Sequence, residues 1–282
     1  MLSRSLTSHQ VSGKAILEPT LARPEVRSRF VREARLYRNL DHPHIVTILD
    51  ADPTADPPYI TFEYLDQVCS LMDVLAGKEQ RPFHPHRLLE EIASALAYLH
   101  EQGIIHRDLK PANILITREG CPKLIDLGLA RSVTDDDTRL TREGQVLGTL
   151  AYMALEQIRG EEATEASDVY SFGLIALEVL AGRPIFSSLA ARPIGPAVRL
   201  GDSWAPLEEL APGASGGWMR IVERCLRIGG VSIQSGADLE AALGGHREDA
   251  PETLPLVRPL DVDVGGPPIR SGSIRHQSRV IP

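Results

Sequence analysis

The stretch from residue 106 to residue 113 gathers side chains whose types suit the transfer of a phosphoryl group. Asp108, Lys110 and Asn113 all lie within it. Phosphoryl transfer needs little covalent help from a protein, because a carboxylate orients the attacking hydroxyl and cations neutralise charge. Asp108 suits the carboxylate role, Lys110 can reach the transferring phosphate, and Asn113 offers an amide oxygen to a magnesium ion. The alternative is a polar loop that collects such residues only to form caps and turns.

A second acidic position follows eighteen residues after Asp108. Asp126 precedes Leu127 and Gly128 and comes directly after the apolar run KLI. A carboxylate at the end of a strand and next to a glycine can approach a metal ion that bridges nucleotide phosphates. An Asp before a Gly can also be a plain turn. Its distance from residues 106–113 favours magnesium binding.

The sequence HRDLKPAN matches the catalytic-loop pattern of protein kinases, H-R-D-L-x-x-x-N, at every fixed position. Five fixed residues would occur by chance in a chain of this length on the order of once in 10⁴ sequences. The chain therefore resembles the protein kinase family. A lysine at the position of Lys110 is similar to the serine/threonine kinases rather than to the tyrosine kinases. Asp126-Leu127-Gly128 is similar to the D-F-G motif, with leucine in place of phenylalanine. The stretches GTLAYMALEQ and SDVYSFGLIALEVLAGRPIF resemble the bacterial branch of the family.

This resemblance implies an α+β fold with two lobes, a reduced β-rich N-lobe and a mainly helical C-lobe. It also implies ATP and Mg²⁺ as cofactors. Asp108 would be the base, Lys110 would contact the phosphate, and Asn113 and Asp126 would bind the metal.

Four further residues stand where the family binds its nucleotide. Lys14 in GKAIL matches the strand lysine that holds the α- and β-phosphates, and Glu33 in FVREARL matches the helix glutamate that holds this lysine. Glu63 and Leu65 lie in YITFEYL, which resembles the hinge between the lobes, and adenine would bond to their backbone. For Lys14 and Glu33 the alternative is an ordinary exposed position, because Lys and Glu are common surface residues.

The polar segment between Asp126 and Glu156 resembles the loop that kinases of this type use as a switch. A phosphate on such a loop pairs with the arginine of the catalytic loop, here Arg107, and orders the segment. Thr138 and Thr141 are the candidate phosphosites. Both can equally be solvated loop residues.

Hydrophobic periodicity predicts the elements that must position these residues. Short strands are expected at VSGKAILE, IVTIL and YITFEY, and two short apolar runs, NILIT and PKLIDL, are separated by a REG turn. One helix is expected from Pro24 to before Pro43, and another from Pro85, with an apolar face and Gly103 at its end. A third, expected from about residue 168 to residue 180, is apolar nearly all round and should be buried.

We expect three segments: a partial kinase N-lobe over residues 1–65, the C-lobe over 66–244, and a flexible tail rich in Pro and Gly over 245–282. Asp168, in SDVYSFG, matches the residue that holds the catalytic loop of the family through backbone hydrogen bonds. It could instead only cap a helix.

Three features depart from the family pattern. Only one glycine occurs in the thirteen residues before Lys14, so the G-x-G-x-x-G-x-V loop is not found there. Residues 154–156 read A-L-E where the family has A-P-E. No arginine lies between residues 228 and 235 to pair with Glu156. We therefore expect an unpaired carboxylate and a loosened or repacked region around it.

Composition excludes several other classes. A chain of 282 residues with 43% hydrophobic content can build one large domain or two modest lobes. The net charge of −8, with acidic and basic residues interleaved, argues against nucleic acid as a partner. Cys69, Cys121 and Cys225 are far apart and suggest neither a disulfide framework nor a zinc site, which fits a cytoplasmic protein. No apolar run in this chain approaches the roughly 20 residues that span a bilayer.

The first interpretation is an ATP-dependent serine/threonine protein kinase that acts on protein substrates and self-associates for trans-autophosphorylation. The second is a pseudokinase, a binding or regulatory module without efficient turnover, which the missing glycine loop favours. A small-molecule phosphotransferase is a third, although Arg107 and the GTLAYMALE stretch argue against it. A fourth is a truncated copy or a chain read from the wrong start.

Overall fold

The computed structural model describes residues 11–15, 37–52, 55, 59–127, 151–185, 207–228 and 231–244. For residues 11–15 the backbone alone is described. The helix expected between Pro24 and Pro43 lies mostly outside the described residues.

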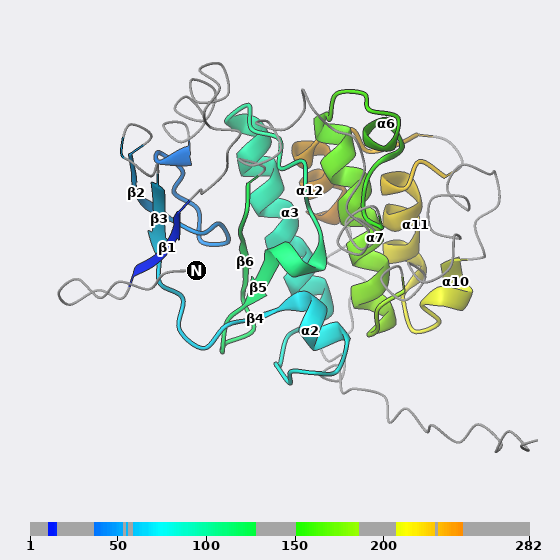
Figure 1. Cartoon of the computed structure of the whole chain (residues 1–282). Coiled ribbons are helices and arrows are strands. Elements are labelled where there is room, and N and C mark those ends of the chain that lie inside the picture. Colours follow the sequence, from blue (N-terminus) through cyan, green and yellow to red (C-terminus); the bar gives the residue numbers. More distant parts are fainter. Residues whose placement is uncertain are drawn as a thin grey trace, which may run out of the picture.

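A three-stranded antiparallel sheet forms the smaller part of the molecule (Figure 1). Its strand order is β1–β3–β2, where β1 is Val11–Ala15, β2 is Ile48–Asp52 and β3 is Tyr59–Glu63. The register places Lys14 opposite Ile60, which is buried. The strands predicted around Lys14 and at YITFEY are therefore confirmed.

The strand expected at residues 45–49 begins later than predicted, at Ile48. Ile45 instead forms an isolated parallel bridge with Leu124. The Leu124 amide donates to the carbonyl of His44 at 2.8 Å, and the Val46 amide donates to the carbonyl of Leu124 at 3.0 Å. These bonds attach the small sheet to the larger part of the molecule.

A second sheet has the order β4–β5–β6. Its strands are β4 (Cys69–Ser70), β5 (Ile114–Ile116) and β6 (Pro122–Leu124), all paired antiparallel. β5 and β6 form a hairpin whose turn contains Gly120 at a φ of 85°, a conformation that favours glycine. Both strands coincide with the predicted runs NILIT and PKLIDL.

The rest of the described chain is mainly helical. Its helices are α2 (Leu71–Leu75), α3 (Pro85–Glu101), the 3₁₀ helix η2 (Pro111–Asn113), α6 (Leu155–Ile158), α7 (Glu165–Ala181), α10 (Leu207–Leu210), α11 (Gly216–Cys225) and α12 (Gly236–Gly244). None of the helices that the structure describes is both long and apolar enough to span a bilayer.

Helix α3 forms where the sequence predicts it. Proline is favourable in the first turn, because the amide that it lacks would have no helical acceptor there. The apolar face is fully buried, and the chain leaves the helix through Gly103 at a φ of 68°. The buried face comprises Leu88, Leu89, Ile92, Leu96 and Leu99.

Helix α7 begins three residues earlier than predicted. Thr164 precedes its first residue, and the Thr164 amide donates to Oγ of Ser167 at 3.0 Å. The helix ends at Gly182, which has a φ of 66°. Its buried residues run almost continuously from Ala166 to Val179, as its uniform apolar sequence predicts.

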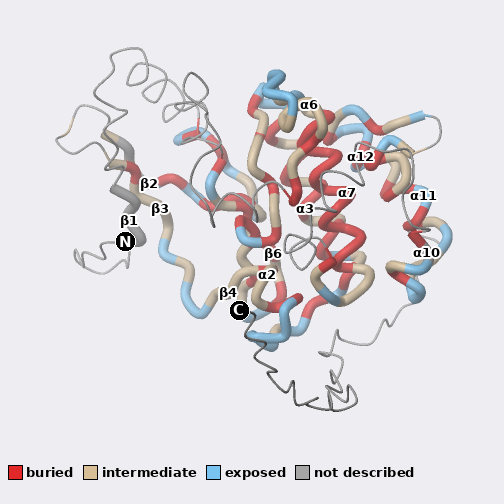
Figure 2. Tube along the Cα trace, turned by 45° about the vertical axis from the view of Figure 1, so that its right-hand side comes forward, coloured by how far each residue is buried: buried red, intermediate tan, exposed pale blue. Residues whose placement is uncertain are grey.

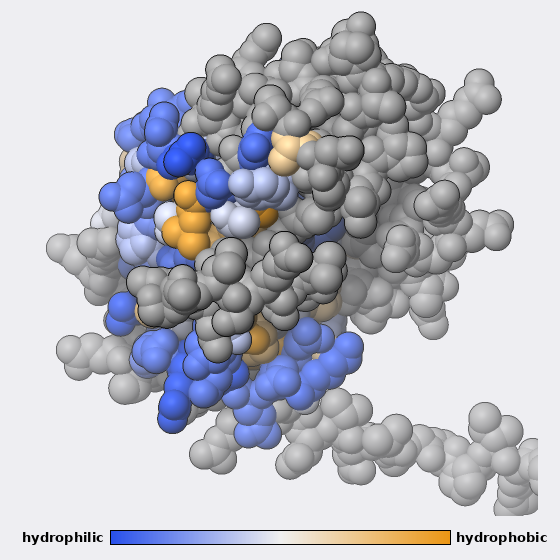
Figure 3. All heavy atoms as spheres, turned by 60° about the vertical axis from the view of Figure 1, so that its left-hand side comes forward, coloured by the Kyte–Doolittle hydropathy of each residue, from blue (hydrophilic) through white to orange (hydrophobic). Residues whose placement is uncertain are grey.

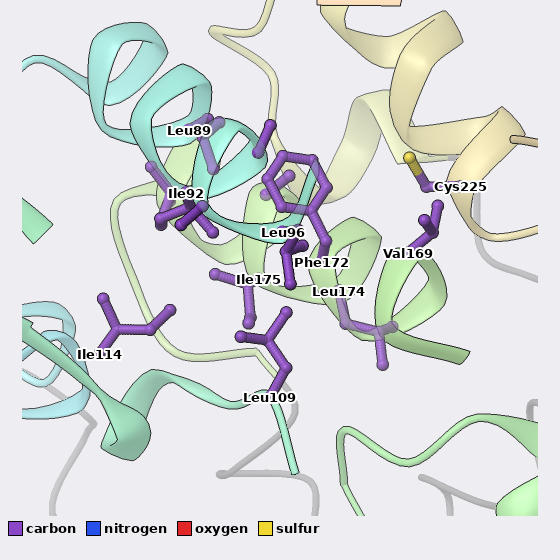
Figure 4. Packing of buried hydrophobic residues seen from close by; sticks show 14 of the residues in the cluster. Leu89, Ile92, Leu96, Leu109, Ile114, Val169, Phe172, Leu174, Ile175 and Cys225 are labelled. Carbon is purple, nitrogen blue, oxygen red and sulfur yellow. The ribbon is translucent and has the colours of Figure 1, made fainter. Parts of the chain in front are cut away.

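The core lies where α3 and α7 pack against each other, and Figure 2 shows both helices largely buried. Figure 4 shows Leu96 of α3 and Phe172 and Ile175 of α7 in this packing. Helix α12 packs on α3 so closely that a Cβ at Gly236 would lie 2.6 Å from Cα of Ala97. The surface seen in Figure 3 is mostly hydrophilic where it is described, with small apolar spots.

Candidate active site

Asp108, Lys110 and Asn113 converge in the segment between α3 and β5. Nζ of Lys110 lies 2.8 Å from Oδ2 of Asp108, and both side chains are about four-fifths buried. Nδ2 of Asn113 donates to the backbone carbonyl of Asp108 at 2.8 Å and to its Oδ2 at 3.1 Å. These bonds hold the carboxylate in one orientation and turn the side-chain oxygen of Asn113 away from it.

Asp126 is brought next to this group by the backbone. The amide of Ile125 donates to the carbonyl of Asn113 at 3.0 Å, so the chain leaving β6 brings Asp126 beside Asn113, the last residue of η2. Asp126 has a φ of 56°, an unusual conformation for a residue other than glycine. Such conformations cost on the order of 1–3 kcal/mol and concentrate at functional sites.

A magnesium ion fits the donors at this place. Magnesium prefers oxygen ligands and is usually bound by one or two protein groups together with phosphates and water. The amide oxygen of Asn113 and the carboxylate of Asp126 are ligands of this kind. A cluster of three or more His, Cys, Asp and Glu side chains does not occur in the described part of the chain.

The carboxylate of Asp168 accepts hydrogen bonds from the backbone that leads into Asp108. Oδ2 of Asp168 accepts from the amide of His106 at 2.7 Å, and Oδ1 accepts from the amide of Arg107 at 2.9 Å. Asp168 lies inside α7, whose N-terminal cap is Thr164. Its carboxylate therefore supports the catalytic loop and is not the cap of the helix.

His100 completes this support and was not found by sequence analysis. Its Nδ1 accepts from the amide of Gly236 at 2.8 Å, so Nε2 carries the proton and donates to Oδ2 of Asp168 at 3.1 Å. His100 is buried on α3, where the helical pattern calls for an apolar side chain. The signal available in the sequence was a histidine on the predicted apolar face of this helix.

Comparison with known proteins decides the family. The sequence matches the family described as protein kinase domain over residues 3–197. The chain belongs to this family. It is 41% identical over 194 residues to the serine/threonine-protein kinase PknB of Mycobacterium tuberculosis, which covers 66% of this chain and 30% of the relative. It is 39% identical over 163 residues to the kinase PrkC of Bacillus subtilis, which covers 58% of this chain and 25% of that protein. The chain thus spans less than a third of the length of these relatives.

A solved structure shows the same fold. The kinase domain of PknI from Mycobacterium tuberculosis, solved as a mutant, matches with a TM-score of 0.60 at 21% identity, covering 84% of this chain and 85% of that one. The predicted α+β kinase fold is confirmed, with β1–β3 in the N-lobe and the helices in the C-lobe.

Glu63 is the last residue of β3, and its side chain bonds to two neighbouring segments of the chain. Its Oε1 accepts from Nζ of Lys123 at 2.9 Å and from the amide of Thr47 at 2.9 Å. Burial opposes the charge of Glu63, but the bonds from Lys123 and Thr47 outweigh burial and lower its pKa. The Glu63 amide already donates to the carbonyl of Thr47 at 2.9 Å. The side chain of Glu63 therefore joins the sheet of β1, β2 and β3 to β6, just before Asp126.

The other predicted nucleotide and loop residues are less fully described. The backbone of Lys14 lies in β1, and its side chain is not described. Leu65 is half-buried two residues after the end of β3. Glu33, Thr138 and Thr141 lie outside the described residues.

The expectation that Glu156 has no arginine partner is wrong. Nη2 of Arg227 lies 2.8 Å from Oε1 of Glu156, and Nη1 lies 3.0 Å from Oε2. Oγ of Ser167 donates to Oε1 at 2.6 Å. The chain turns after α11 with Arg227 at a φ of 59°, so its side chain reaches Glu156 from one residue outside the range searched. The region around Glu156 is therefore held together by an ion pair and hydrogen bonds and is not loosened.

This pair makes stability depend on pH. Burial opposes the charge of Glu156, but the bonds from Arg227 and Ser167 lower its pKa from 4.5 to about 2. Arg227→Gln should lower the free energy of unfolding by about 2 kcal/mol at pH 7, since bonds to charged groups are worth about that much. Because the pKa of Glu156 in the folded protein lies below its value in the unfolded chain, this stabilisation is complete above pH 4.5. It is lost as the pH falls toward 2. Urea titrations of the parent and variant should therefore converge as pH falls through that window.

Arg220→Gln is the matched control, because Arg220 is an exposed arginine on the same helix, α11. Its stability should follow that of the parent at every pH. An Arg227 variant as stable as the Arg220 variant at pH 7 would show that the pair contributes nothing.

His106 is completely buried, and both of its ring nitrogens lack a hydrogen-bond partner among the residues that the structure describes. Burial lowers its pKa below 6.5, so the folded protein contains the neutral ring. The unfolded chain binds a proton more readily, and stability is therefore lost as pH falls below 6.5. His106→Phe should reduce the difference in unfolding free energy between pH 7.5 and pH 5.5, roughly the range over which a histidine titrates. The exposed His84 offers a control, and His84→Gln should leave that difference unchanged.

Proposed function

We propose that this chain transfers the γ-phosphate of ATP to serine or threonine hydroxyls of protein substrates. The observation that carries this proposal is the grouping of Asp108, Lys110 and Asn113, with Lys110 2.8 Å from the carboxylate and Asn113 bonded to it. The similarity to kinases named for serine and threonine supports the choice of acceptor.

In this mechanism Asp108 orients the substrate hydroxyl and accepts its proton as the oxygen attacks the γ-phosphorus. Lys110, which now neutralises Asp108, would contact the transferring phosphate. Asn113 and Asp126 would hold magnesium, which when bound neutralises charge on the phosphate oxygens. The loop is positioned before substrate arrives, because Asp168 fixes the two amides that precede Asp108.

The nucleotide would lie between the lobes. Lys14, oriented by Glu33, would contact the α- and β-phosphates, and the adenine would bond to the backbone of Glu63 and Leu65. At Glu63 the carbonyl is the group proposed for this bond, since the amide donates to Thr47. Phosphorylation at Thr138 or Thr141, by a second copy of the chain, would order the switch loop through Arg107.

A second candidate is a binding or regulatory module that turns over ATP poorly. Residues 1–13 contain one glycine, Gly13, so this stretch by itself supplies no phosphate-covering loop.

The deciding experiment measures phosphate incorporation from ATP into the protein itself and into a generic protein substrate, with sites mapped by mass spectrometry. Incorporation that requires magnesium and is absent from Asp126→Asn would support the kinase. A parent that incorporates no phosphate but shows an ATP-induced rise in Tm would favour the binding module. A parent that shows neither phosphate incorporation nor an ATP-induced rise in Tm would count against both candidates.

A further inference from the structure

Gln157, on the short helix α6, bridges to the catalytic loop. Its Nε2 donates to the carbonyl of Arg107 at 2.8 Å, and its Oε1 accepts from the amide of Ala154 at 3.2 Å. Ala154 is the N-terminal cap residue of α6 and is fully buried. Both ends of the Gln157 amide are therefore used, one within its own helix and one on the residue that precedes Asp108.

The residue that receives this bond has an unusual backbone. Arg107 has a φ of 64°, which is costly for a side chain other than glycine and persists only where the surroundings impose it. Its amide donates to Asp168 at 2.9 Å, and its carbonyl accepts from Gln157. These two bonds fix both peptide groups of Arg107. The second of these peptide groups contains the backbone nitrogen of Asp108. Its orientation therefore sets the direction in which the side chain of Asp108 points.

Helix α6 is itself held in place. Glu156, the neighbour of Gln157, is bound by Arg227 at 2.8 Å and by Ser167 at 2.6 Å. A continuous set of bonds therefore leads from Arg227 through α6 to the peptide before Asp108.

We propose that Gln157 is a positioning residue for phosphoryl transfer, holding the Arg107 carbonyl so that Asp108 faces the acceptor hydroxyl. This inference rests on the proposed function. Gln157 does not touch the reacting atoms, and its effect on them passes through Arg107. A misplacement of about 1 Å can cost about 10²-fold in rate, so loss of this bond should be visible in kcat.

The test compares three substitutions that separate the two ends of the side chain. Gln157→Leu removes both bonds, and Gln157→Glu keeps the acceptor for Ala154 but has no donor for Arg107. Gln157→Lys supplies a donor for Arg107 but no acceptor for Ala154. We expect kcat to fall about 10- to 100-fold in the Leu and Glu variants and less in the Lys variant, with KM for ATP changed less than about twofold. Gln102→Leu, at an exposed glutamine after α3, is the control.

Amide hydrogen exchange gives a readout that does not depend on activity. The Asp108 amide shares a peptide group with the Arg107 carbonyl and donates to the carbonyl of His106 at 2.8 Å. Loss of the Gln157 bond should speed exchange of this amide about tenfold or more relative to the parent, at a temperature where both proteins are folded. Equal kcat and equal exchange in all variants would overturn the inference, as would a Lys variant no better than the Glu variant. If the parent transfers no phosphate, the proposed function fails. Exchange of the Asp108 amide then decides alone whether Gln157 holds the loop.

Discussion

Asp108→Asn is expected to lower the rate of phosphate transfer by about 10²- to 10⁴-fold, the range that general base catalysis supplies. Asparagine has nearly the same shape and keeps an oxygen that can accept from Nδ2 of Asn113, which now lies 3.1 Å from the carboxylate. It cannot accept the proton of the attacking hydroxyl, and it removes the negative charge 2.8 Å from Lys110. ATP affinity and Tm should therefore change far less than the rate.

Single-turnover measurements at saturating ATP isolate this step. Asp238→Asn, at an exposed carboxylate on α12, is the matched control and should keep the parent rate. An Asp108→Asn protein that retained more than about a tenth of the parent rate would show that this carboxylate is not the base.

Asp168→Ala is expected to produce the largest loss of stability, roughly 3–5 kcal/mol in the free energy of unfolding. Asp168 is 1% exposed and accepts from the amides of His106 and Arg107 and from Nε2 of His100. Alanine would leave two buried donors and the part-buried amide of Arg107 without an acceptor, and each buried one costs on the order of 1–3 kcal/mol. The same change frees the loop before Asp108, so phosphate transfer should be lost even at temperatures where the variant stays folded.

Urea unfolding and hydrogen exchange at residues 106 and 107 check this prediction. Glu165→Gln is the comparison, because Glu165 is a carboxylate in the same helical turn with 43% of its side chain exposed. It should change stability by less than about 1 kcal/mol. Similar losses in both variants would mean that the bonds from Asp168 to the loop contribute little.

The grouping of Asp108, Lys110 and Asn113 could be predicted because it is local. Asp108, Lys110 and Asn113 all lie between residues 108 and 113, so their closeness in the sequence is enough to bring them together. The buried face of α3 and its end at Gly103 are local as well, since a helical period and a left-handed glycine act over a few residues. The sequence by itself therefore determined the family resemblance, the grouping of these three side chains and most of the elements that carry them.

The supports of that group were decided only by the tertiary structure. Asp168 reads equally well as a helix cap until α7 packs beneath the loop, and Glu156 has no visible partner until the turn after α11 delivers Arg227. The partners of His100 and Gln157 lie 136 and 50 residues away. Which distant polar groups meet depends on how helices pack and where the chain takes a left-handed turn, and hydrophobic periodicity carries no information about either. Once those helices are packed, unpaired buried polar groups are too costly to remain, and the packing selects these partners.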